Sequence, residues 1–185
     1  TDCRSACRKS NRPMSLIHTI SVDEEALLAT SVDAEGWVFA QAAHHHLKEG
    51  WVEAEAVWIM RRDQVPVRLT AEWFKTDTGD RYGTIRATCG DEPAPSCAQV
   101  RGFEAWIRDV EILSIHHNQH GHYDLKIDAG LEFKSHTNEV FSVCLADPRD
   151  HDQKSLLVQG ENPHHRLGGM AVVRRCLTSE TQRPN

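Results

Sequence analysis

The sequence predicts a mainly β protein, a β-rich α+β chain with a helical element at its N-terminal end. Three observations support this fold class. Apolar and polar residues alternate over several short stretches, as they do in half-buried strands. Gly, Pro and Asp cluster between these stretches, where turns are expected. About eight short strands separated by turns favour an antiparallel sandwich or barrel.

The helical element is predicted over residues 23–29. Three carboxylates precede good helix formers there, and negative charge at a helix N-terminus is stabilised by the helix dipole. A second helix is predicted over residues 35–48, because Trp37, Ala40 and Leu47 are spaced to share one face and a glycine follows as a stop. A strand around Trp37 is the alternative.

Strands are predicted from residue 52 onward. Residues 52–59 alternate at first and then become apolar on both faces, as a strand entering a core does. Residues 68–75 and 81–88 flank a polar loop that contains Gly79, which is the clearest hairpin signal in the chain. The long apolar stretch 103–115 fits either a buried strand or a short helix running into a strand, since periodicity alone does not separate them.

A second hairpin is predicted between residues 123–127 and 131–134. The tripeptide Asp128-Ala129-Gly130 is interpreted as its turn, and alternating charges predict one solvent-facing side. Three further strands are predicted at residues 140–146, 155–159 and 170–173.

Domain organisation follows from length and charge. The 185 residues fit one domain, since domains typically hold about 100 to 200 residues. Residues 1–13 are predicted to be a basic N-terminal arm, flexible or non-native, and residues 14–185 a single β-rich domain. The formal net charge is −6, from 21 Lys+Arg and 27 Asp+Glu. An acidic body of this kind disfavours nucleic acid as a partner, because it repels phosphates.

The compartment is predicted from apolar segments and cysteines. No apolar stretch approaches the roughly 20 residues that cross a bilayer, so no membrane span is expected. The six cysteines are expected to be reduced because no signal segment is visible, which favours a soluble, cytoplasmic protein. A disulfide between Cys89 and Cys97 across a Pro-rich loop is the alternative.

Histidine is unusually frequent, with 12 residues in the chain. His116, His120 and His122 are candidate ligands for zinc or another divalent metal, because residues at i and i+2 of a strand point to the same face. The competing interpretation is a polar loop and strand edge. Neither a helical zinc-protease motif nor a CxxC pair is present, which favours that simpler interpretation.

Aromatic and basic residues suggest a second candidate site. Trp51 and Tyr82 could stack on bases, while Arg61, Arg62 and Arg81 could meet phosphates, as in barrels that bind single-stranded nucleic acid. The alternative is that large rings pack in the core, which is the commoner fate of aromatic residues on strands.

Asp124, Glu132 and Lys134 form the pattern that most resembles an enzyme. Metal-dependent nucleases place an acid on one strand and an acid-x-Lys on the next, all facing one divalent ion. Ordinary cross-strand ion pairs on a solvated hairpin are the alternative. No nucleophile-elbow sequence is found.

The sequence favours a non-enzymatic binding or assembly protein that acts through a protein partner or through self-association. Hairpin edges can pair with another chain, and no catalytic motif is complete. Two alternatives are a single-stranded nucleic-acid-binding barrel and a divalent-metal-dependent hydrolase or nuclease.

Overall fold

The computed structural model describes residues 14–32, 34–42, 52–61, 64–77, 79–90, 99–119, 123–145, 149, 156–159 and 171–177. These residues form one helix and ten strands, so the predicted mainly β fold is confirmed. The elements in chain order are β1 (Met14–His18), α1 (Val22–Ala29), β2 (Ala34–Ala42), β3 (Val52–Arg61), β4 (Val67–Lys75), β5 (Arg81–Cys89), β6 (Gln99–Gln119), β7 (Tyr123–Ser135), β8 (Val140–Leu145), β9 (Leu156–Gln159) and β10 (Val172–Leu177).

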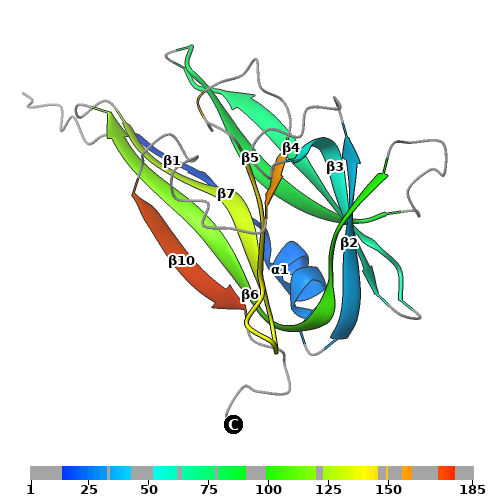
Figure 1. The fold of residues 1–185 in the computed structure, drawn as a ribbon. Helices are drawn as coiled ribbons and strands as arrows, with labels where there is room; N and C mark the ends of the chain where they lie inside the picture. The colour runs from blue at the N-terminus through cyan, green and yellow to red at the C-terminus, as the bar shows by residue number, and fades with distance from the viewer. Residues whose placement is uncertain are drawn as a thin grey trace, which may run out of the picture.

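The strands pair in the order β1-β7-β8-β9-β3-β2-β6-β10, with β4 attached to β3 and β5 attached to β4. Every described pairing is antiparallel except that of β1 with β7. Figure 1 shows β1, β7, β6 and β10 in one layer, β2 to β5 in another, and α1 between them. Among the described strands, β1, β5 and β10 each pair on one side only, so the sheet is not a simple closed barrel.

β6 joins the two layers because it is 21 residues long. Its first part pairs with β2, and its second part lies between β7 and β10. The apolar stretch 103–115 is therefore a strand throughout. In the β6–β7 ladder the register shifts between Ile107 and Asp109, so Arg108 is an extra residue of β6, and a bulge of this kind bends the strand that carries it.

The helix predicted over residues 35–48 is wrong, because residues 34–42 form β2. Pairing on both edges outweighs the helical spacing: Trp37 is opposite Met60 of β3 on one side and Glu104 of β6 on the other. The run Trp37-Val38-Phe39 also consists of residue types that favour strands. The alternative strand around Trp37 is the one found.

The predicted second hairpin is also wrong, because β7 is one continuous strand. Ser114 pairs with Asp128 and Leu113 with Gly130, so Ala129 is the extra residue of a β-bulge. A Cβ added to Gly130 would lie 2.7 Å from the Cβ of Cys144. Glycine is therefore needed for close approach to β8, and not for a turn.

Several local predictions are confirmed. α1 begins at a capping box, in which Ser21 and Glu24 exchange hydrogen bonds between side chain and backbone. The strongest predicted hairpin corresponds to β4 and β5. The strands predicted at residues 140–146 and 155–159 correspond to β8 and β9, while the one at 170–173 is β10, which begins later and ends at Leu177.

The core lies between the two layers. Leu28 of α1, Ile85 of β5 and Phe133 of β7 are fully buried in one continuous apolar cluster. Cys144 is a buried core thiol, and Cys89 and Cys176 are exposed free thiols. No helix among the described residues is long and apolar enough to cross a membrane.

Candidate functional site

The residues predicted to bind nucleic acid do not share a surface in the part of the chain that is described. Trp51 and Arg62 lie outside it. Tyr82 is only 4% exposed, and its ring lies 6.0 Å from the ring of Phe74, so it is not available to stack on a base. Arg61 is buried at the end of β3, whereas Arg81 is exposed at the start of β5.

Of the three predicted metal ligands, only His116 lies within the described residues. His116 is exposed on β6, opposite Lys126 of β7, and His120 and His122 lie outside the described residues. Within the described ranges, no three His, Cys, Asp or Glu side chains are grouped to hold a metal ion.

The carboxylates that the nuclease hypothesis requires do not lie close to one another. Asp124 and Glu132 lie on the same strand, β7, and eight positions of a strand span about 26 Å. Asp124 is exposed and pairs with Asn118, while Glu132 is buried. These two carboxylates therefore do not face a common ion.

Glu132 and Lys134 instead belong to a charge cluster with Glu111 of β6 and Arg174 of β10. Nη1 of Arg174 donates to Oε1 of Glu132 at 2.6 Å and to Oε2 of Glu111 at 2.9 Å. Nζ of Lys134 lies 2.8 Å from Oε1 of Glu111 and 3.6 Å from Oε1 of Glu132. Two cations and two carboxylates thus neutralise one another across three strands.

The electrostatics of the charge cluster favour ionised groups. Burial opposes the charge on Glu111, but hydrogen bonds from Lys134 and Arg174 outweigh it and hold the pKa of Glu111 below its ordinary value. The hydrogen bond to Glu111 raises the pKa of Lys134. A divalent cation would have to displace both basic side chains, so the cluster is suited to fastening β10 and not to metal catalysis.

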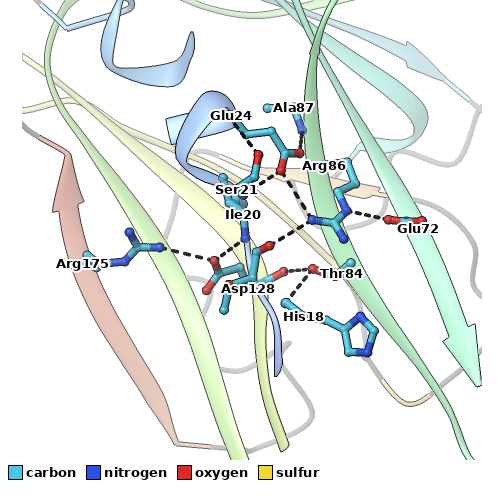
Figure 2. A network of polar contacts seen from close by, with 11 residues as sticks. His18, Ile20, Ser21, Glu24, Glu72, Thr84, Arg86, Ala87, Asp128 and Arg175 are labelled. Atoms are coloured by element: carbon cyan, nitrogen blue, oxygen red, sulfur yellow. Dashed lines mark hydrogen bonds and ion pairs between the residues drawn. The ribbon is translucent and has the colours of Figure 1, made fainter. Parts of the chain in front are cut away.

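A second anchor lies on the opposite face of β10 and centres on Asp128, which has no solvent exposure (Figure 2). Its Oδ2 accepts a hydrogen bond from the backbone N–H of Ile20 at 2.8 Å, and its Oδ1 accepts one from the hydroxyl of Ser114 at 2.5 Å. Arg175 completes the site, with Nη2 3.4 Å from Oδ2 of Asp128 and Nη1 paired with Glu25 of α1.

The edge of β5 is covered by the segment around α1. Oε1 of Glu24 accepts from the backbone N–H of Ala87 at 3.0 Å, and Nη1 of Arg86 donates to the backbone oxygen of Thr19 at 3.0 Å (Figure 2). The backbone N–H of Ala87, which an additional strand would need, is therefore already used at this edge.

The edge of β10 differs. Its one described partner strand is β6, to which all six residues are paired. Val173 is 50% exposed and Cys176 is exposed, while Arg174 and Arg175 extend back over opposite faces of their own sheet. We define the β10 edge as residues 172–177, and it is the candidate functional site.

Comparisons with protein-family models, with curated proteins and with solved structures gave no significant match.

The sequence identified Glu132 and Lys134 but not their partners. Glu111 and Arg174 are 63 positions apart and meet only once β10 has paired with β6. One signal was available: Glu111 is a carboxylate between the apolar residues Val110 and Ile112, and a charge in such a position is usually paired.

Proposed function

We propose that the protein is a non-enzymatic binding or assembly protein that pairs its β10 edge with a strand of another polypeptide, in the simplest case a second copy of this chain. The observation that carries the proposal is a strand that is anchored on both faces and, among the described residues, is paired on one side only. An unpaired strand edge presents alternating N–H and C=O groups, which are the groups that strand addition uses.

The two anchors hold β10 in an ordered, extended conformation that is suited to strand pairing. Arg174 holds one face of the strand to the charge cluster, and Arg175 holds the other face to Asp128 and Glu25. A strand that is already ordered loses little conformational entropy when a partner arrives, which favours binding.

The charges of β10 do not prevent pairing. Exposed charges usually protect an edge strand from association. Here both guanidinium groups are bound by carboxylates of the same chain, so their charge is largely compensated. The exposed side chain of Val173 adds apolar surface for a cross-strand contact.

β1 provides the matched comparison. It is also paired on one side among the described strands, and Ile17 on it is 62% exposed. None of the ion pairs described for this chain involves a residue of β1. We therefore assign pairing to the β10 edge.

Sedimentation velocity over a range of protein concentrations tests the proposal. The wild-type chain is expected to form dimers or larger assemblies as concentration rises. Val173→Lys places a charge on the β10 edge and is expected to shift the equilibrium toward monomer, whereas Ile17→Lys on β1 leaves it unchanged. A chain that stays monomeric at every concentration, or a loss of assembly in Ile17→Lys alone, would contradict the proposal.

A further inference from the structure

Arg61 is a buried cation without an anionic partner in the described part of the chain. Its side chain lies at the end of β3, and the residue is 6% exposed. Nη1 donates to the hydroxyl of Thr30, and Nη2 donates to the backbone oxygen of Val65 at 2.5 Å. Burial lowers the pKa of Arg61, and the smaller, opposing interaction with Cys89 does not offset it. Buried charges are normally paired, because desolvation is costly.

The simplest role for Arg61 is to cap α1. Thr30 is the C-cap residue, and its hydroxyl donates to the backbone oxygen of Leu27 while it accepts from Arg61. A helix C-terminus carries a partial negative charge of about half a unit, and this favours a cation there. The partial negative charge at the end of α1 therefore compensates part of the charge on Arg61, and the site keeps a net positive charge.

Two polar groups in this region lack hydrogen-bond partners. Nε of Arg61 is buried without an acceptor, and the hydroxyl of Ser31, next to the capping Thr30, is buried without any partner. Buried polar groups in folded proteins nearly always have partners, so an exception calls for an explanation. The unused Nε–H of Arg61 and the unused hydroxyl of Ser31 are therefore available to an acceptor that binds from outside.

We propose that Arg61 anchors a binding site for a small oxyanion, a carboxylate or a phosphate group, at the C-terminal end of α1. A guanidinium has five N–H donors, and the two bonds that Arg61 makes within the described residues leave Nε–H and one N–H on each terminal nitrogen. Nε–H and a neighbouring terminal N–H form the fork that binds two oxygens of one oxyanion.

Exposed residues border the buried guanidinium. Val65, whose carbonyl accepts from Arg61, is 60% exposed, and the adjacent Gln64 is also exposed. An oxyanion would supply the missing counter-charge, and the hydroxyl of Ser31 could donate a further hydrogen bond. This site is separate from the β10 edge, so either proposal can fail without the other.

Nuclear magnetic resonance of the arginine Nε–H groups tests the proposal directly. Inorganic phosphate and acetate are titrated separately against sodium chloride at equal ionic strength. The Nε–H signal of Arg61, identified by its loss in Arg61→Lys, is expected to shift saturably with phosphate or acetate and not with chloride. Arg108 is the internal control, because its side chain is 41% exposed and already paired with Asp109.

Thermal unfolding gives a second readout. The anion that shifts the Arg61 signal is expected to raise the melting temperature of the wild-type chain and to lose at least half of that effect in Arg61→Lys. Ser31→Ala keeps the fold in any case, because the hydroxyl makes no hydrogen bond. It is expected to weaken anion binding about tenfold, the loss of one hydrogen bond to a charged group.

Comparing acetate with phosphate distinguishes a site for carboxylates from a site for phosphate groups. Saturation by acetate alone assigns the site to carboxylates, and saturation by phosphate alone assigns it to phosphate groups. An Arg61 signal that moves no more in phosphate and acetate than in chloride overturns the proposal. Equal stabilisation of the wild-type chain and Arg61→Lys by both anions also overturns it.

Discussion

Arg175 on β10 places its Nη2 atom 3.4 Å from Oδ2 of Asp128, a carboxylate with no solvent exposure on β7. The same carboxylate holds the backbone N–H of Ile20, which leads into α1. The last described strand and the first helix are thus fastened to one buried group. This contact links the order of the β10 edge to the core of the protein.

Asp128→Ala is expected to destabilise the chain strongly. The substitution leaves the N–H of Ile20 and the hydroxyl of Ser114 without their acceptor and removes a partner of Arg175. We expect the free energy of unfolding in urea to fall by about 2 to 4 kcal/mol, as is typical when a buried hydrogen-bonded charge is removed.

Asp124→Ala is the matched control for this substitution, because Asp124 is an exposed carboxylate on the same strand. Its effect is expected to stay within about 0.5 kcal/mol. Equal effects of the two substitutions would show that Asp128 does not hold the structure together.

The stability of the protein is expected to fall in mild acid. Burial opposes ionisation of Glu24 and Glu111, but hydrogen bonds outweigh it and hold the pKa of each in the folded chain below the ordinary value of 4.5. The unfolded chain therefore binds protons more readily. The stabilisation from these groups is complete above that value and is lost as the pH falls through the folded pKa.

Glu111→Gln tests this dependence by urea unfolding at pH 7 and at pH 3.5. At pH 7 the free energy of unfolding of the variant is expected to be about 1 to 3 kcal/mol below that of the wild-type chain, because its bonds to Lys134 and Arg174 no longer involve a carboxylate. The difference should be clearly smaller at pH 3.5, where the wild-type chain has itself lost part of the stabilisation from this carboxylate. Glu139→Gln, at an exposed position, should follow the wild-type profile. If Glu111→Gln lowers the free energy of unfolding equally at both pH values, protonation of Glu111 is not a source of the acid sensitivity.

Gly130→Ala is expected to destabilise the β-bulge of β7. The new methyl group would lie 2.7 Å from the Cβ of Cys144 and 3.0 Å from the backbone oxygen of Val143. Overpacking of this kind typically costs about 1 to 3 kcal/mol. The double variant Gly130→Ala/Cys144→Gly removes one of the two clashes, so its loss should be smaller than the sum of the single losses. Additive losses in thermal unfolding would show that the two residues do not meet.

Ser142→Ala is expected to stabilise the protein. The hydroxyl of Ser142 is fully buried on β8 and has no hydrogen-bond partner in the structure. Removing an unsatisfied buried polar group is expected to raise the free energy of unfolding by about 1 kcal/mol. A loss of stability larger than that gain would mean that the hydroxyl has a partner in solution.

Short-range signals predicted much of the fold. Acidic residues before residue 26 indicated where α1 begins. Gly79, in a polar loop between two stretches of strand-like sequence, identified the β4–β5 hairpin. The errors fell where partners distant in sequence decide the outcome. β2 is a strand because β3 and β6 pair with both its edges, and residues 128–130 stay extended because β6 and β8 lie on either side.

The candidate site was less predictable for the same reason. Glu132 and Lys134 stood out in sequence, but they were assigned to a carboxylate that lies far along the same strand. Their actual partners, Glu111 and Arg174, come from strands that precede and follow β7. Short strands such as β10 carry no sequence signal of which neighbour they will pair with.

Hydrogen exchange at the amides of residues 172–177, in dilute and in concentrated protein, tests the proposed role of the β10 edge most directly. In dilute protein, we expect the amides of β10 that point away from β6 to exchange fast. At high concentration these amides should become protected, while the amides of β1 stay as they were. Exchange rates in β10 that do not change with concentration would contradict assembly through this edge.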